Sequence, residues 1–125
     1  MGGFSFKTTS GKKQVSTDGG STWENFSSGA ELLWDNPAPS SSFTSKTVSI
    51  DLSNYESVIV RCNSTDTLIP KGTSGYAMQF DSTWAFYRKT TVSNNGVTFG
   101  NGHGNNGDNP SHCIPTKIYG VGFSL

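Results

Sequence analysis

Carboxylates are the first residues to consider for chemistry, because glycoside hydrolysis needs two of them at a defined separation, one with a raised pKa. The chain has nine Asp and Glu residues in all, and Glu24 with Glu31 is the only nearby pair on predicted strands. Solvated strand faces account for both side chains without catalysis. The sequence also lacks a GxSxG motif, a Cys–His arrangement of known spacing and a phosphate-binding loop. We therefore predict that the protein is not an enzyme.

Two histidines and two cysteines are the next groups that could bind a metal or react. His103 and His112 lie in or beside a Gly- and Asn-rich segment with Asp108, but their spacing matches no zinc pattern, and we predict no metal and no cofactor. Cys62 and Cys113 permit one disulfide. Because the first residues lack the charged and apolar regions of a signal peptide, we expect a chain made in a reducing cytoplasm, with two buried thiols.

Residues 16–23, STDGGSTW, fit the pattern SxDxGxTW, which resembles the Asp-box of sialidase-like propellers. In that motif Asp18 bonds the amides of a turn, Gly20 accepts an unusual φ and Trp23 packs beneath the hairpin. The pattern occurs once, and 125 residues are too few for a propeller. We therefore predict a structural turn here rather than part of a glycosidase.

Large aromatic side chains and short amide side chains favour surface recognition as the function. Trp34, Trp84, Tyr76, Tyr87 and Arg88 could stack on sugar rings or anchor a protein interface, although ordinary core is the favoured interpretation of any single one of them. Residues 100–110, GNGHGNNGDNP, predict a long, mobile surface loop whose amides could bond hydroxyl groups, or a mobile tip without a ligand. The candidate ligand contacts are Asn101, His103, Asn105, Asn106, Asp108, Asn109, Trp84, Tyr87 and Arg88.

Composition excludes several other classes of protein. Lys plus Arg equals Asp plus Glu at nine each, so the clustered positive charge that nucleic-acid binding requires is missing. The longest apolar runs have three or four residues, as at 58–60, so we predict no membrane span. Aromatic residues reach 12%, whereas disordered chains are poor in them. We expect a folded domain that binds neither nucleic acid nor membrane.

Alternating apolar residues predict the elements that must position these groups. The alternation is clear in residues 47–52, 57–63, 76–80, 83–92 and 117–123, and residues 90–99 form a hairpin around Asn94, Asn95 and Gly96. The prolines of residues 36–42 predict an extended crossover between sheets. The fold class is therefore all-β: a single antiparallel β-sandwich, jelly-roll-like, over residues 14–125. Residues 1–13 form a flexible or docking arm, with Phe4 and Phe6 as candidate attachment residues.

Several segments together resemble a module from tail-associated proteins of phages that infect Gram-positive bacteria, the proteins of fibres, baseplates and appendages. The segments are SGAELLW at 28–34, Asn36-Pro37, Pro39, Phe43, TVSIDLS at 47–53, Tyr55, VSNNGVTFG at 92–100, Ile114-Pro115 and KIYG at 117–120. They are spread over about three quarters of the chain. Such modules usually form the C-terminal part of longer proteins, whereas here the module nearly fills the chain. The chain is therefore also compatible with a small baseplate, head-fibre or capsid-decoration subunit.

The resemblance implies a virion protein, assembled in the cytoplasm of the bacterial host, with no catalytic residues to carry over. It implies a host-recognition or adhesion surface, with a host cell-wall glycan as a possible ligand, and a homo-oligomer, commonly a trimer. Gly120 and Gly122 in the last predicted strand would let another chain approach closely. The arm would bind other virion proteins. The alternatives are a decoration protein of capsid or tail with a purely structural role, a free-standing lectin-like module and, least favoured, a carbohydrate-active enzyme.

Overall fold

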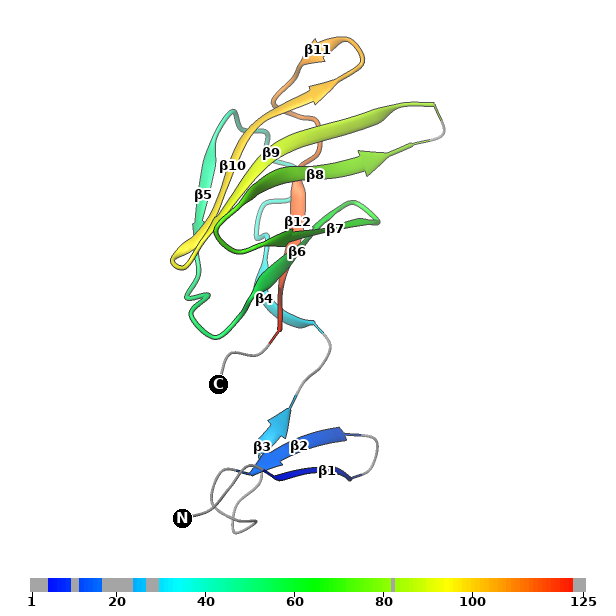
Figure 1. Ribbon diagram of the computed structural model, residues 1–125. Helices are drawn as coiled ribbons and strands as arrows, with labels where there is room; N and C mark the ends of the chain where they lie inside the picture. Colours follow the sequence, from blue (N-terminus) through cyan, green and yellow to red (C-terminus); the bar gives the residue numbers. More distant parts are fainter. Residues whose placement is uncertain (1–4, 10–11, 17–23, 27–29, 82, 123–125) are drawn as a thin grey trace.

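The computed structural model describes residues 5–9, 12–16, 24–26, 30–81 and 83–122, and these residues form strands, turns and loops without a helix (Figure 1). The prediction of an all-β chain is confirmed. No helix of the described segments is long and apolar enough to cross a membrane. The strands are β1 (Ser5–Thr9), β2 (Lys12–Ser16), β3 (Glu24–Phe26), β4 (Glu31–Asp35), β5 (Lys46–Ser49), β6 (Ser57–Cys62), β7 (Thr65–Pro70), β8 (Ser74–Phe80), β9 (Ala85–Ser93), β10 (Gly96–Gly104), β11 (Gly107–Asp108) and β12 (Pro115–Val121).

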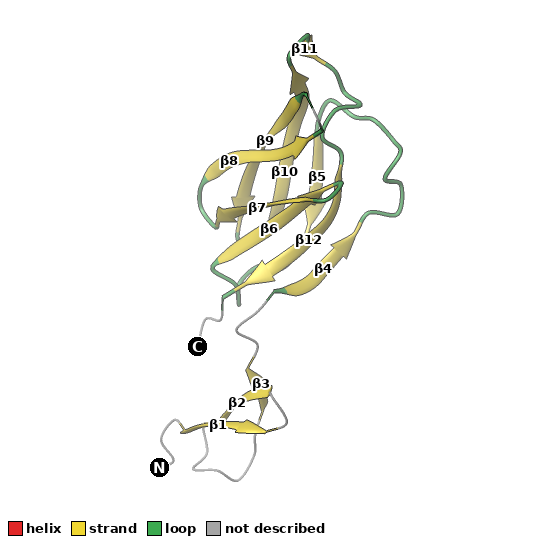
Figure 2. Cartoon of the chain, turned by 90° about the vertical axis from the view of Figure 1, so that its right-hand side faces the viewer, coloured by secondary structure: helices red, strands yellow, loops and turns green. Residues whose placement is uncertain are grey.

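Two antiparallel sheets pack face to face as a β-sandwich. One has the strand order β4-β12-β6-β7, and the other has the order β11-β10-β9-β8 with β5 also paired to β10 (Figure 2). The second sheet is a meander of consecutive strands, β8 to β10, and the first contains the β6-β7 hairpin. The predicted sandwich is confirmed, whereas the jelly-roll connectivity stays a prediction.

The core lies between these sheets and follows the alternation of the sequence. Val58, Val60 and Cys62 on β6 are each at most 1% exposed, and Val97 and Phe99 on β10 are fully buried. Each of the buried Val and Phe side chains contributes roughly 1.5–3 kcal/mol by leaving water. The same period places the intervening residues of β6 toward the outside, as a strand with one face on the core requires.

The segment after β4 crosses from one sheet to the other, as its prolines predict. β4 belongs to the first sheet and β5 to the second. Asn36 fixes the start of the crossover, because its side-chain amide donates to the Pro115 carbonyl at 2.8 Å and its backbone N–H donates to the Thr116 carbonyl at 2.9 Å. Asn36 is buried, so these bonds satisfy a polar group that water cannot reach.

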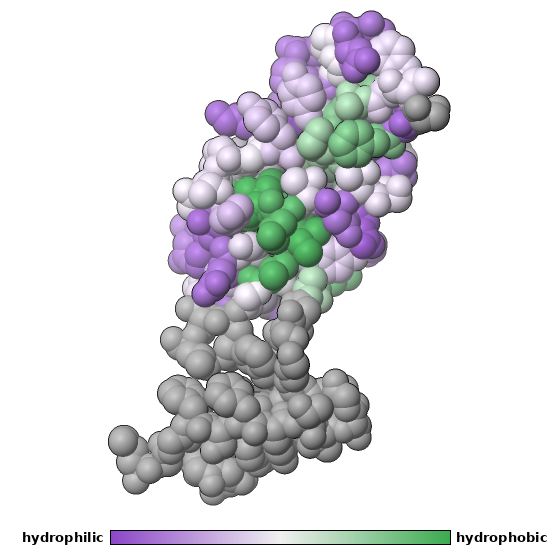
Figure 3. Space-filling view, turned by 45° about the vertical axis from the view of Figure 1, so that its right-hand side comes forward, coloured by the Kyte–Doolittle hydropathy of each residue, from purple (hydrophilic) through white to green (hydrophobic). Residues whose placement is uncertain are grey.

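The aromatic face of β8 points outward. Tyr76 and Phe80 are more than half exposed, whereas Ala77 between them is fully buried. Ala77 pairs with Arg88 of β9, whose side chain is also fully buried. Figure 3 shows one face of the molecule on which apolar surface is surrounded by polar side chains.

The prediction that residues 100–110 form one long loop is wrong. β10 continues to Gly104, turns, and pairs with β11 through His103 with Asp108 and Gly104 with Gly107. The Asn109 N–H then donates to the Gly102 carbonyl at 2.8 Å. Glycines make this possible because they let the backbone pack closely without a side chain. The predicted hairpin at residues 90–99 is confirmed as β9-β10.

β1, β2 and β3 form a three-stranded antiparallel sheet of their own. β2 runs across positions 13 and 14, where the sequence predicts a domain boundary, and that boundary stays a prediction. Most of the SxDxGxTW motif and Phe4 lie outside the described residues, and Phe6 belongs to β1.

Candidate functional site

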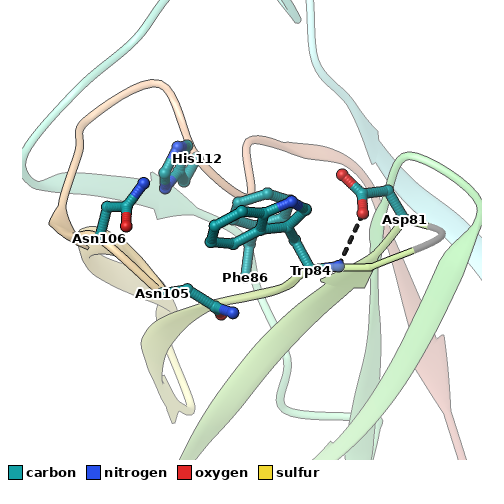
Figure 4. A pocket seen from close by; sticks show the side chains of 6 residues that line it. All are labelled: Asp81, Trp84, Phe86, Asn105, Asn106 and His112. Atoms are coloured by element: carbon teal, nitrogen blue, oxygen red, sulfur yellow. Dashed lines mark hydrogen bonds between the residues drawn. The ribbon is translucent and has the colours of Figure 1, made fainter.

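A pocket of about 290 Å³ lies where the β8–β9 connection meets the tip of the β10-β11 hairpin. Its lining comes from two regions of the chain, residues 81–86 and residues 105–112. The residues are Asp81, Trp84, Phe86, Asn105, Asn106 and His112. Figure 4 shows the rings of Trp84 and Phe86 between Asp81 on one side and Asn106 and His112 on the other.

Asp81 positions Trp84 through a local turn. One carboxylate oxygen accepts the backbone N–H groups of Thr83 and Trp84 at 3.0 and 2.8 Å, and the Asp81 N–H donates to the Trp84 carbonyl at 3.0 Å. An aspartate that bonds the backbone two and three residues later is a common way to hold a turn. Trp84 is 38% exposed, and its side chain lines the pocket.

Phe86 and His112 form the rear of the pocket. Their ring centroids lie 4.5 Å apart, with the planes tilted by 52°. Gly104 makes this arrangement possible, because a Cβ there would lie 2.8 Å from His112 Nδ1 and 2.9 Å from Phe86 Cδ1. Nδ1 of His112 is buried without a hydrogen-bond partner among the described residues.

Arg88 holds the base of the site together from inside the protein. Arg88 is one of the predicted ligand contacts, but the Arg88 side chain is fully buried and does not reach the surface. Its guanidinium donates five hydrogen bonds of 2.6 to 3.1 Å to backbone carbonyls. Burial lowers the pKa of Arg88. The acceptors are Phe43, Gly100, Pro110, His112 and Cys113.

Three of the predicted contacts, Tyr87, His103 and Asp108, lie on the face of the sheet opposite to the pocket. Tyr87 follows Phe86 on β9 and therefore points outward. Its ring stacks on His103 with centroids 5.0 Å apart, and Tyr76 meets it edge-on at 5.5 Å. His103 Nδ1 is paired with the Asp108 carboxylate. This group forms a row across β8 to β11 that does not line the pocket.

Two other predicted contacts, Asn101 and Asn109, form hydrogen bonds with residues next to them in the sequence. The side-chain oxygen of Asn101 accepts the N–H of Gly102 at 2.9 Å. The side-chain oxygen of Asn109 accepts both the N–H and the hydroxyl of Ser111, at 2.9 and 2.7 Å. Of the nine predicted contacts, the structure therefore brings Trp84, Asn105 and Asn106 together in the pocket.

The sequence interpretation misses three of the lining residues, Asp81, Phe86 and His112. The spacing of Asp81 and Trp84 is a turn signal that could have linked them. Phe86 could not be separated from core aromatics by sequence. His112 draws attention only as a possible metal ligand, and within the described segments no three His, Cys, Asp or Glu side chains gather as a metal site.

The carboxylates and thiols considered for chemistry lie apart from the pocket. Glu24 is in β3 and Glu31 is in β4, so they belong to different sheets. Glu31 accepts the Tyr55 hydroxyl, and this bond raises the pKa of Tyr55 to about 12. Cys62 and Cys113 are free and buried, in agreement with the prediction. Hydrogen bonding to Cys113, together with burial, raises the pKa of the Cys62 thiol.

Comparison with known proteins finds no counterpart: no family model, no curated protein and no solved structure matches the chain.

Proposed function

We propose that this chain is a non-enzymatic phage virion surface protein that uses the pocket at the tips of its hairpins to recognise the host envelope, with a cell-wall glycan as the possible ligand. The resemblance to tail-associated modules supports the virion role. The pocket supports recognition, because an exposed tryptophan and two carboxamides line one concave site.

The residue types of the pocket carry this proposal. Trp84 offers an exposed aromatic face, and Asn105 and Asn106 each offer a donor and an acceptor. Asp81 is the only carboxylate among the six lining residues, and one of its oxygens is occupied by two backbone amides. Hydrolysis by a pair of carboxylates would need a second one near it. The site is therefore better suited to binding than to turnover.

Assembly is part of the same proposal. We propose a homotrimer, formed in the host cytoplasm and attached to other virion proteins through the N-terminal arm, by analogy with the modules that the chain resembles. Gly120 gives no argument for it, since a Cβ there would lie 2.6 Å from the Tyr55 ring and 2.7 Å from Leu33 of the same chain. Light scattering coupled to gel filtration measures the oligomeric state, and a strict monomer would contradict the trimer.

Attachment to a panel of Gram-positive cells tests the recognition function. We expect Trp84→Ala to weaken attachment by about tenfold or more, because it removes the accessible aromatic face of the pocket. Leu68→Ala is the matched control, since Leu68 is 59% exposed on β7 and does not line the pocket. Equal attachment of both variants, with unchanged melting temperatures, would contradict recognition through this site. Particles stabilised by a protein that never attaches to cells would favour the structural decoration role.

A further inference from the structure

We infer that the pocket takes an uncharged pyranose sugar rather than an anionic wall polymer. This inference rests on the proposed recognition function and names the ligand class of the same site. Three properties of the pocket lead to it: its aromatic surface, its paired amides and its charge.

The aromatic surface fits the apolar side of a sugar ring. A pyranose has C–H groups on its faces and hydroxyl groups around its edge, so it needs a flat apolar contact with polar groups beside it. Trp84 provides that contact, and the ring of Phe86 lies next to it in the pocket. A volume of about 290 Å³ is at the small end for ligand pockets and suits a single sugar ring better than a folded peptide segment.

The amides fit the edge of the sugar. A hydroxyl both donates and accepts, and each carboxamide of Asn105 and Asn106 does the same. Both residues lie at the tip of the β10-β11 hairpin, between strands that end at Gly104 and begin at Gly107. The pairing of His103 with Asp108 closes this hairpin, so the amides are presented on an ordered turn.

The charge of the pocket disfavours a phosphate-bearing polymer. Asp81 is the one formally charged residue of the lining, and no Lys or Arg is among the six residues. A phosphate would meet the Asp81 carboxylate without a cation to offset the repulsion.

His112 does not change this balance. A proton on Nδ1 would bury an N–H group without an acceptor, which costs free energy, so the arrangement favours the tautomer with hydrogen on Nε2. Because His112 lines the pocket, its Nε2–H is then a candidate further donor to a sugar hydroxyl.

Protein-observed NMR with defined sugars tests the ligand class. The probes are the methyl glycosides of glucose, galactose, mannose and N-acetylglucosamine at millimolar concentration, with a glycerol phosphate oligomer as the anionic comparison. We expect at least one glycoside to shift the Trp84 indole N–H signal in a saturable manner and the phosphate oligomer to leave it unchanged. Trp84→Phe assigns that signal among the three tryptophans. Asn106→Ala should weaken the binding severalfold, and Asn54→Ala, an exposed turn amide outside the pocket, should not.

Two results would overturn the inference while the proposed function stands. One is a saturable shift with the phosphate oligomer alone. The other is no shift with any glycoside in a protein that still attaches to cells through Trp84. Failure of the wild-type protein to attach to any cell would instead refute the recognition function itself.

Discussion

The guanidinium of Arg88 covers the ring of Phe43 at 4.1 Å and also donates to the carbonyl of the same residue at 2.8 Å. One side chain thus ties β9 to the crossover that joins the two sheets. The remaining four donors hold the backbone on either side of the pocket hairpin. Arg88, which the sequence predicts as a surface ligand contact, is instead a buried residue that stabilises the backbone around it.

Arg88→Ala should destabilise the fold by about 3 kcal/mol or more, because it leaves several inward carbonyls without donors. Arg88→Lys should recover only part of the loss, since an ammonium cannot match the planar fork of donors. Urea unfolding followed by circular dichroism measures both. Lys89→Ala, at the exposed neighbouring position, is the control. Similar midpoints for Arg88→Ala and Lys89→Ala would show that the carbonyls find other partners.

Gly102→Ala should be strongly destabilising. Its Cβ would lie 2.4 Å from the Asn109 carbonyl oxygen and 2.5 Å from that of His112, and backbone cannot move aside as a flexible side chain can. We expect a loss of about 1–3 kcal/mol or more from this overpacking. Gly100→Ala is the matched control, because the nearest atoms to its Cβ would be 3.7 Å away. Thermal melting compares the two variants, and an unchanged melting temperature in Gly102→Ala would argue against the ordered hairpin at residues 100–110.

Tyr55 should ionise later than an ordinary tyrosine. The bond to Glu31 raises its pKa from 10.0 to about 12, so the folded chain holds the phenol proton more tightly than the unfolded chain does. The stabilisation from this bond is therefore complete below pH 10 and is lost as the pH rises through about 12. Absorbance titration of the phenolates should show one late component that Tyr55→Phe removes. Retention of that component in Glu31→Gln would mean that Glu31 is not its cause.

Both cysteines should resist thiol reagents in the folded protein. Cys62 and Cys113 are at most 1% exposed, and the raised pKa of Cys62 keeps its reactive thiolate scarce. We expect slow reaction with a disulfide reagent in buffer and rapid reaction of two thiols per chain after unfolding in denaturant without a reductant. Fast labelling of the native chain would indicate that the core opens, and no labelling after unfolding would indicate a disulfide.

Much of the sandwich is determined by local pattern. The period-two burial of β6, the β9-β10 hairpin and the crossover at residues 36–42 all follow from the residues that form them. Such features depend on neighbours in sequence, and alternation, turn residues and prolines encode them directly. The free, buried state of Cys62 and Cys113 also agrees with expectation.

Tertiary structure alone decided which face of β8 is exposed to solvent and which distant residues line the pocket together. Alternation shows that Tyr76 and Phe80 share a face, but only the folded structure shows that this face is exposed while Ala77 and its partner Arg88 are buried. Residues 100–110 have almost no apolar content, yet the hydrogen bonds from Arg88 to their backbone order them. The pocket joins Trp84, Asn106 and His112 only after β9 and the β10-β11 hairpin are brought side by side. These outcomes depend on partners distant in the chain, which composition and spacing cannot specify.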